Sequence, residues 1–459
     1  MKKSFITILL LLICILSFSQ KYQSTWESID SRPVPEWFTD SKFGIFIHWG
    51  LYSVPAWAPA DKDNPTYTNF SEWFWSRMNN DNEEGKIFRE HLKNNYGENF
   101  KYQDFAGQFK AENFYPEQWA EIFKKAGARY VVLTSKHHEG FTLWPSEHSW
   151  NWNSMDLGPH RDLCGDLTQA VKDAGLYMGF YYSLYEWYNP LYHKNLEKYV
   201  DDHMIPQMKD LVTRYEPDIV WTDGEWEHPS EKWKSTQFLA WLYNESPVRG
   251  KVCVNDRWGK ETRGVHGGFY TTEYEQEESK KGSSDNGKPW EECRGIGHSF
   301  GYNRMENAED YMSSDNLVDL LIRKVAAGGN LLLNVGPTAD GRIPAIQQQR
   351  LLDIGKWLAV NGDAIYHTKT WEGSEKNDAE NIYFTKKGND LFVLCTEFPE
   401  GPVEVKGINK AGTVTMLGFN GKVKSRKKGN TLIINIPSIT PLNNPGNYAW
   451  VFKIENVIK

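Results

Sequence analysis

Asp223 stands at the end of a short apolar run, in the stretch DIVWTDGEW that covers residues 218–226. An ionised carboxylate is costly to bury unless a partner compensates its charge. Such a residue therefore marks either a strand that ends at a solvated turn or a site that uses the carboxylate. Glu225 follows two residues later, on the same face of an extended chain, and we expect it to pair with a nearby base.

Four other apolar runs end in polar or titratable residues in the same manner. FGIFIHWG ends with His48, YVVLTSKHHEGF with His137 and His138, MGFYYS with Tyr181, and VCVNDRWG with Arg257. Any one of these residues could belong to a capped or solvated turn. Five such ends in one chain instead predict that the side chains meet on one rim, where a site can be both dry and polar.

The residue types on this rim favour hydrolysis of a glycoside. His137 and His138 are adjacent, so on an extended chain they point to opposite sides, and no His-x-His pair offers a metal site. What remains is a carboxylate surrounded by His, Tyr, Arg and Trp. That set suits a reaction in which one carboxylate attacks and another acid protonates the leaving oxygen. We expect no metal and no cofactor; a metal-dependent hydrolase that uses His48 and both adjacent histidines is an alternative.

The elements that must position this rim alternate between strand and helix from about residue 43 to 361. The predicted strands are residues 43–47, 130–134, 177–182, 219–221, 252–254 and 331–335. The predicted helices are residues 116–126, 167–174, 193–215, 231–243, 317–327 and 344–360. Such alternation indicates a parallel sheet, and at this length a closed TIM-like (β/α)8 barrel is expected. An open doubly wound sheet is the alternative, disfavoured because no glycine-rich phosphate loop follows these strands.

A second, smaller domain is predicted for residues 369–459. Short alternating segments such as NIYFTKKGNDLFVLCTEF and KKGNTLIINIP are separated by Gly-Asn and Asn-Gly turns. This pattern is typical of an antiparallel β-sandwich. The segment contains no obvious catalytic cluster, so we expect the site in the barrel domain, residues 21–368.

The composition restricts the class of protein. Charged residues make up 24% of the 459 residues and hydrophobic residues 40%, as in ordinary soluble globular proteins. The net charge of −8 provides no basic stripe, which argues against nucleic acid as a partner. The 20 Trp and 23 Tyr gather in loop-like stretches such as EWFWSRM and YEWYNP. Flat rings there suit either stacking on sugars or packing at a domain boundary.

The beginning of the chain predicts export. Residues 1–20, MKKSFITILLLLICILSFSQ, show two lysines, an apolar run and small polar residues, as in a bacterial-type signal peptide. No later stretch is apolar over the length that a membrane span needs, so we expect a periplasmic or secreted protein without such a span. The four remaining cysteines are too scattered to form a disulfide framework. The sequence leaves the oligomeric state open.

The motifs taken together resemble those of a known family. FGIFIHWG, KHHEGFTLWPS, RDLCGDL, WTDGEW, NDRWG and LLLNVGPTADG occur in order between about residues 35 and 370. As a set they are similar to glycoside hydrolase family 29, the α-L-fucosidases. The resemblance implies a catalytic barrel followed by a β-sandwich, a retaining mechanism through a covalent fucosyl-enzyme, and chemistry that needs no metal.

The resemblance also implies roles for individual residues. Asp223, in the family's Trp-x-Asp-Gly motif, becomes the nucleophile. The other matching positions are the hydroxyl-binding residues His48, His137, His138 and Tyr181, the Glu-Trp pair Glu72 and Trp73, the arginine Arg257 near the reacting centre, and Trp221 on the apolar wall.

The acid/base varies in position between branches of the family. Glu273, in FYTTEYEQ, is the first candidate because it follows HGGFY, and Glu291, in KPWEECRG, is the alternative. Glu292 and Glu275 are less favoured, and each of these glutamates could instead be a solvated loop carboxylate. For a retaining enzyme the acid should lie about 5–5.5 Å from the nucleophile.

The sequence therefore predicts an exo-acting, retaining α-L-fucosidase that removes terminal fucose from fucosylated glycans. Fucose has an axial hydroxyl and a C5 methyl, so His and Glu can bind its hydroxyls while aromatic rings cover the methyl. Sites built to satisfy sugar hydroxyls discriminate strongly against analogues that lack them. A fucose-binding protein without catalysis and a barrel glycosidase of other sugar specificity, such as a galactosidase, are the alternatives.

Overall fold

The computed structural model describes residues 22–60, 70–274, 287–377 and 380–458. The predicted signal peptide and Glu275 lie outside these ranges. Among the residues within them, no helix combines the length and the apolarity needed to cross a bilayer.

Eight parallel strands form the central sheet, in the order β5-β4-β3-β2-β1-β8-β7-β6. They are β1 (Phe43–Ile47), β2 (Tyr130–Lys136), β3 (Tyr177–Ser183), β4 (Ile219–Asp223), β5 (Cys253–Val254), β6 (Tyr270–Glu273), β7 (Trp290–Gly295) and β8 (Asn330–Val335). Pairing of β1 with both β2 and β8 joins the first strand to the last, as in a barrel. Between β5 and β6 the chain is tied by backbone bonds from Phe269 to Val254 (3.0 Å) and from Gly268 to Asn255 (3.2 Å). The predicted TIM-like barrel is confirmed, and the open doubly wound sheet is wrong.

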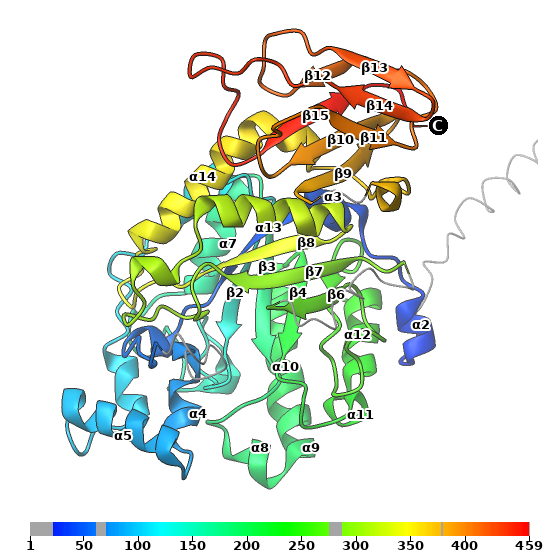
Figure 1. The fold of residues 1–459 in the computed structure, drawn as a ribbon. Helices are drawn as coiled ribbons and strands as arrows, with labels where there is room; N and C mark the ends of the chain where they lie inside the picture. Colours follow the sequence, from blue (N-terminus) through cyan, green and yellow to red (C-terminus); the bar gives the residue numbers. More distant parts are fainter. Residues whose placement is uncertain (1–21, 61–69, 275–286, 378–379, 459) are drawn as a thin grey trace, which may run out of the picture.

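Helices cover the outside of the sheet (Figure 1). The covering helices include α6 (Pro116–Lys125), α7 (Leu163–Asp173), α10 (Ile205–Tyr215), α12 (Ser235–Asn244), α13 (Ser314–Ala326) and α14 (Ala345–Asn361). Because both faces of the sheet are covered, β1, β2, β4 and β8 are buried along their whole length. Their side chains alternate: Ile45 and Ile47 join the core under the helices, whereas Phe46 joins a separate cluster inside the barrel.

Two predicted helices are interrupted in the structure. The one predicted for residues 193–215 divides into α8 (Pro190–Lys194), α9 (Leu196–Tyr199), a π-turn (Val200–Met204) and α10. The π-turn precedes Pro206, which has no N–H to donate to the preceding turn. The helix predicted for residues 231–243 breaks at Lys234, whose φ of 53° is left-handed, into α11 (Ser230–Trp233) and α12.

The C-terminal part forms two antiparallel sheets, β12-β15-β10-β9 and β11-β14-β13, as predicted. The strands are β9 (Ile382–Lys387), β10 (Asp390–Cys395), β11 (Val403–Lys406), β12 (Val414–Met416), β13 (Ser425–Lys428), β14 (Thr431–Ile434) and β15 (Trp450–Ile454). In Figure 1 these strands lie over α13 and α14. The arrowheads of β2 and β4 point away from them, so the carboxyl rim of the barrel is remote from the C-terminal sheets.

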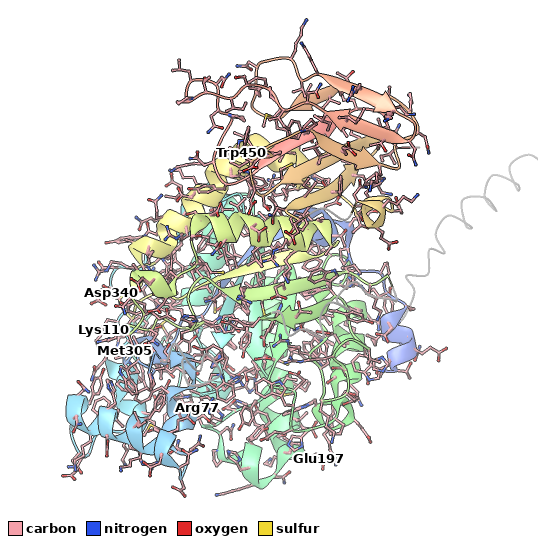
Figure 2. The ribbon with its side chains drawn as sticks, in the orientation of Figure 1. Arg77, Lys110, Glu197, Met305, Asp340 and Trp450 are labelled. Carbon is pink, nitrogen blue, oxygen red and sulfur yellow. The ribbon has the colours of Figure 1, made fainter. Side chains whose placement is uncertain are left out.

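β10 packs on both of its faces. Leu391 and Val393 point into the core between the two C-terminal sheets, whereas Phe392 and Leu394 belong to the core of the barrel. Trp357 of α14 donates its indole N–H to the carbonyl of residue 449, 3.0 Å away. Figure 2 shows Trp450, at the start of β15, beside α14. The C-terminal sheets and the barrel therefore share an apolar interface.

Candidate active site

A pocket of about 340 Å³ opens at the carboxyl rim of the barrel. It is lined by Phe46, His48, Phe70, Glu72, Trp73, His137, His138, Tyr181, Trp221, Asp223, Trp226, Arg257, Arg263, Glu273 and Phe300. The structure thus brings together every predicted site residue except Glu291. A volume of this size matches a small-ligand site, at the end of the barrel where active sites occur.

Strand ends place most of the polar side chains. Asp223 and Glu273 are the last residues of β4 and β6, and His48 directly follows β1. Tyr181 of β3 is paired in register with Trp221 of β4, so both aromatic rings enter the pocket side by side, stacked with centroids 5.7 Å apart.

Asp223 is buried, but two guanidinium groups and one phenol hydroxyl surround its carboxylate. Arg257 Nη1 donates to its Oδ1 at 2.7 Å, Tyr181 donates its hydroxyl to Oδ2 at 3.0 Å, and Arg263 Nη2 lies 3.5 Å from Oδ1. Burial alone would raise the pKa of the Asp223 carboxyl, but the positive charges of Arg257 and Arg263 lower that pKa well below its usual range. The carboxylate is therefore ionised and held in one orientation, as a nucleophile requires.

Gly224 permits the turn that presents Asp223. Its φ of 74° is left-handed, and a Cβ at this position would lie 2.5 Å from the Cβ of Tyr185. The carbonyl of Asp223 accepts a bond from the backbone of Leu184 at 2.7 Å. The glycine that follows the aspartate in the motif thus allows the loops after β3 and β4 to pack closely.

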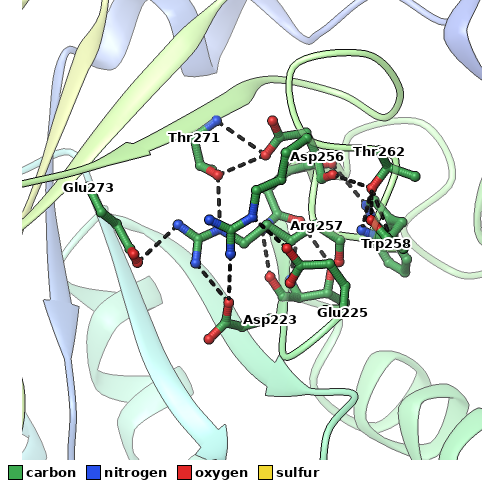
Figure 3. A network of polar contacts seen from close by, with 12 residues as sticks. Asp223, Glu225, Asp256, Arg257, Trp258, Thr262, Thr271 and Glu273 are labelled. Carbon is green, nitrogen blue, oxygen red and sulfur yellow. Dashed lines mark hydrogen bonds and ion pairs between the residues drawn. The ribbon is translucent and has the colours of Figure 1, made fainter. Parts of the chain in front are cut away.

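Arg257 connects two of the carboxylates that line the pocket, those of Asp223 and Glu273 (Figure 3). Its Nη1 contacts Asp223, its Nη2 lies 2.9 Å from Glu273 Oε1, and its Nε donates to Thr271 Oγ1 at 2.9 Å. Thr271 is held in turn by Asp256 at 2.7 Å. The guanidinium lies 4.4 Å from the ring centre of Trp221. The buried guanidinium of Arg257, called the Arg257 fork below, therefore fixes the positions of the Asp223 and Glu273 carboxylates.

Glu225 pairs with a base, as the sequence predicted, and that base is Arg263. The Glu225 side chain is buried, and this burial raises its pKa. The Nε of Arg263 contacts Glu225 while Nη2 faces Asp223. Glu225 thus anchors a second guanidinium beside Asp223.

Two histidines offer hydrogen-bond acceptors to the pocket. The side-chain N–H of Asn334 donates to the carbonyl of Phe300, which fixes the orientation of the amide. The side-chain oxygen of Asn334 therefore accepts a hydrogen bond from Nδ1 of His48 at 2.7 Å. Ser183 donates to the carbonyl of Tyr185, so its hydroxyl accepts from Nδ1 of His138 at 2.6 Å. In each ring, Nε2 is left with its lone pair.

Both histidines are neutral. Burial lowers the pKa of His48 to about 3, and burial likewise lowers the pKa of His138 well below its usual value. Glu72, whose pKa is raised by burial, receives the backbone N–H of Gly301 at 2.9 Å and the hydroxyl of Ser299 at 3.1 Å. The floor of the pocket therefore presents groups that accept bonds from hydroxyls.

His137 and His138 do not point to opposite sides, and that expectation is wrong. β2 ends at Lys136, so the two histidines lie in the following turn rather than on an extended strand. Their ring centres are 4.1 Å apart and both line the pocket. Within residues 22–60, 70–274, 287–377 and 380–458, no three His, Cys, Asp or Glu side chains are grouped to hold a metal ion.

The glutamates considered for the acid/base occupy different places. Glu273 lines the pocket and its side chain is 36% exposed. Glu291 points into the barrel interior, where it accepts bonds from Tyr130 and, at 3.0 Å, from the indole of Trp221. Glu292, on the opposite face of β7, contacts Thr272 and lies 3.7 Å from Lys324 of α13. Of these three, Glu273 is the one that can reach a ligand in the pocket.

Comparison with known proteins identifies the family. The model of the family Alpha-L-fucosidase matches residues 9–363, and that of the Alpha-L-fucosidase C-terminal domain matches residues 375–455. The chain belongs to the α-L-fucosidase family. It is a glycoside hydrolase of that family.

Individual α-L-fucosidases are similar over almost the whole chain. Human tissue alpha-L-fucosidase is 43% identical over 450 residues, which cover 95% of this chain and 92% of the relative. The Branchiostoma floridae alpha-L-fucosidase is 42% identical, covering 98% of this chain and all of the relative. The crystal structure of the Thermotoga maritima alpha-fucosidase in complex with fucose is 38% identical, with a TM-score of 0.78 and coverage of 94% of this chain and 100% of that one.

The pocket of this α-L-fucosidase is also lined by residues that the sequence did not single out: Phe46, Phe70, Trp226, Arg263 and Phe300. Trp226 ends the DGEW motif, and Arg263 lies six residues after Arg257. Closeness to motif residues is the sequence feature that could have suggested them as site residues. The three phenylalanines carry no chemistry that a motif search would register. They supply apolar walls to the pocket.

Gly297 to Gly301, GHSFG, matches the Gly-x-Ser-x-Gly pattern found around the nucleophile of many serine hydrolases. In this α-L-fucosidase, Ser299 is buried, donates its hydroxyl to Glu72, and accepts a hydrogen bond from the hydroxyl of Ser71 at 3.1 Å. No histidine is its recorded partner among the described residues. Ser299 therefore holds Glu72 in place, and the match to the pattern has no catalytic meaning.

Proposed function

We propose that this protein is an exo-acting, retaining α-L-fucosidase that releases terminal α-L-fucose through a covalent fucosyl-enzyme on Asp223, with Glu273 as acid/base. The observation that carries the proposal is the Arg257 fork, which contacts Asp223 at 2.7 Å and Glu273 at 2.9 Å within one pocket. One sugar in that pocket can meet both carboxylates, as double displacement requires.

In the first step, a carboxylate oxygen of Asp223 forms a bond to the anomeric carbon while the glycosidic carbon–oxygen bond breaks. Glu273 gives its proton to the departing oxygen. In the second step, Glu273 takes a proton from water, the water oxygen attacks the anomeric carbon, and Asp223 leaves as a carboxylate. The proposal assigns no step to a metal or a cofactor, because the two carboxylates complete the balance of bonds and protons.

The fucose ring would lie on the pocket floor. Nε2 of His48, Nε2 of His138 and the Glu72 carboxylate are placed to accept bonds from its hydroxyls. Phe46 and Trp221, with ring centres 5.1 Å apart, offer an apolar wall for the methyl group. This division of polar and apolar groups supports fucose over a sugar that carries a hydroxymethyl.

The natural substrate would be a fucosylated glycan or glycoconjugate met outside the cytoplasm. We propose that residues 1–20 are a signal peptide, that residues 21–368 form the catalytic domain, and that residues 369–459 form the second domain. The protein would then be periplasmic or secreted.

Replacement of the nucleophile tests this function. Asp223→Ala is expected to lower kcat on an aryl α-L-fucoside by at least about 10³-fold, because no other group forms the intermediate. A 2-fluoro-fucosyl fluoride label on the wild type is expected to map to Asp223. Asp173→Ala, which removes an exposed carboxylate of α7, is the control.

Four outcomes would contradict the proposal in whole or in part. Unchanged turnover by Asp223→Ala, or a label on another residue, would remove Asp223 from the mechanism. A wild-type protein that binds fucose without releasing product from any fucoside would be a fucose-binding protein, against which the paired acids in the pocket argue. Faster turnover of aryl galactosides than of aryl fucosides would reassign the sugar.

A further inference from the structure

The pocket has a closed floor and an open rim. Side chains on the floor, such as His138, Tyr181 and Trp221, are 1% exposed. Three rim side chains are far more open: Glu273 is 36% exposed, Arg263 37% and Trp226 38%. Glu273 is the last residue of β6, whereas Arg263 and Trp226 lie in the segments that follow β5 and β4, so the rim is assembled from three separate parts of the chain.

The position of Glu273 on this rim fixes where a leaving group must pass. An acid/base protonates the oxygen that joins the fucose to the rest of the substrate. That oxygen therefore lies at the boundary between floor and rim. The next group along the substrate emerges between Glu273 and the other two rim residues, Trp226 and Arg263.

Trp226 is an ordered platform rather than a loose surface residue. Its ring stacks on Trp73 with centroids 6.0 Å apart and 29° between the planes. It also meets His138 at 5.5 Å and Tyr185 at 6.1 Å in edge-on contacts. These neighbours fix the position of the indole and leave part of it exposed to solvent. An ordered, partly exposed aromatic ring of this kind can stack on the apolar face of a ligand.

Arg263 adds hydrogen-bond donors to the same pocket that Trp226 lines. A guanidinium has five N–H donors, and Arg263 directs Nε to Glu225 and Nη2 toward Asp223. Its charge is already balanced by these two carboxylates, so the rim does not select for an anionic ligand. The remaining donors suit the hydroxyls or ring oxygen of a neutral sugar.

We propose that Trp226 and Arg263 form a binding site for the leaving group, and that its ligand is the neutral pyranose to which fucose is attached. Trp226 stacks on the carbon–hydrogen face of this sugar while Arg263 binds its polar edge. This site rests on the proposed function, because it needs fucose on the floor and Glu273 at the glycosidic oxygen. It makes fucosylated saccharides, rather than fucosides of small alcohols, the preferred class of substrate.

The test compares substrates with and without a sugar leaving group. We would measure kcat/KM for a panel of fucosyl-galactose and fucosyl-N-acetylglucosamine disaccharides and for α-L-fucosyl fluoride. In Trp226→Ala the ratio of kcat/KM for the best disaccharide to that for the fluoride is expected to fall about tenfold. Trp226→Phe, which keeps a flat ring, is expected to restore most of that ratio.

Phe398→Ala is the matched control, because Phe398 is 39% exposed but lies in the C-terminal part. It should leave the ratio unchanged. Thermal unfolding of each variant verifies that the fold is intact. The proposal would be overturned if Trp226→Ala left the disaccharide-to-fluoride ratio of kcat/KM unchanged. It would also be overturned if Trp226→Phe lowered that ratio as much as Trp226→Ala does. Failure of the wild type to hydrolyse the fluoride would instead refute the fucosidase mechanism itself.

Discussion

The indole nitrogen of Trp221 donates to Oε1 of Glu291 across 3.0 Å. Tyr130 donates to the other oxygen of the same carboxyl, which lies inside the barrel and is fully buried. The far side of Trp221 carries the Arg257 guanidinium, 4.4 Å from the ring centre, and faces the pocket. Glu291 thus supports the pocket from beneath and does not enter it.

This relationship predicts different kinetics for the two candidate acids. Glu273→Gln should lower kcat/KM by about 10²-fold or more on substrates with poor leaving groups and much less on activated aryl fucosides, because a good leaving group needs no proton. Glu291→Gln should affect both kinds of substrate by a similar factor. A leaving-group series measured on each variant provides the comparison. If the loss of kcat/KM depended strongly on the leaving group in Glu291→Gln and not in Glu273→Gln, Glu291 would be the acid/base instead of Glu273.

Glu291 should also make stability depend on pH. Burial raises its pKa from 4.5 to about 7, so between these values the folded protein holds a proton that the unfolded chain releases. Stability therefore falls as pH rises through this window. Glu291→Gln has no carboxyl to titrate, so it lacks this loss of stability. As pH rises from 4.5 to 7, its free energy of unfolding should increase relative to that of the wild type by up to about 3 kcal/mol.

Chemical denaturation at several pH values measures this gain. Glu121→Gln, which changes an exposed glutamate of α6 that pairs with Lys125 at 2.7 Å, is the control and should show no comparable gain in this window. Parallel pH profiles for Glu291→Gln and the wild type would contradict the prediction.

Removal of Arg257 should shift the acidic limb of the activity profile. Arg257 is the largest of the influences that lower the pKa of Asp223 against the effect of burial. Without the guanidinium that pKa rises, so Arg257→Met should lose activity at a higher pH as the medium is acidified. We also expect kcat to fall by about 10²-fold, from the loss of a positioned charge.

The measurement is kcat/KM on an aryl fucoside as a function of pH. Arg342→Met, which removes an arginine whose side chain is 70% exposed, should reproduce the wild-type profile. An acidic limb at the same pH in Arg257→Met and the wild type would show that Arg257 does not set the ionisation of Asp223.

Gly224→Ala should destabilise the protein more than a comparable glycine replacement elsewhere. Gly224 and Gly429 both have left-handed φ values, 74° and 62°, but a Cβ on Gly429 meets nothing within 4 Å. Both variants carry backbone strain, and Gly224→Ala adds a clash with Tyr185. Its free energy of unfolding should be lower than that of Gly429→Ala by at least about 1 kcal/mol. Equal values from chemical denaturation would show that the loop moves aside freely.

Much of the barrel could be predicted because its strands are apolar on both faces. β1 was predicted with its full bounds, and β2, β3, β4 and β8 to within two residues at either end. β6 and β7 were not predicted. β7 carries Glu291 and Glu292 on opposite faces, and β6 is half-buried along its length, so neither shows an apolar run. Their charges are compensated by partners from distant parts of the chain, which no local pattern reveals.

The pocket floor was more predictable than the rim for the same reason. Asp223 and His48 sit at strand ends, where the chain direction alone places them. Trp226 and Arg263 depend on loop geometry, and their partners Trp73 and Glu225 become neighbours through the tertiary fold. The roles of Glu273 and Glu291 likewise separate once the sheet assigns each side chain to a side of the barrel.

The two-sided packing of β10 bears on how this enzyme can be engineered. A version shortened to the parallel sheet and its helices would remove Phe392 and Leu394 from the hydrophobic core that they share with the barrel domain, and Trp357 would lose its hydrogen bond to residue 449. Such a fragment would be prone to aggregate despite keeping every pocket residue. Fusions, tags and domain exchanges should therefore retain the final strands, which complete the hydrophobic core on the helix-covered side of the barrel.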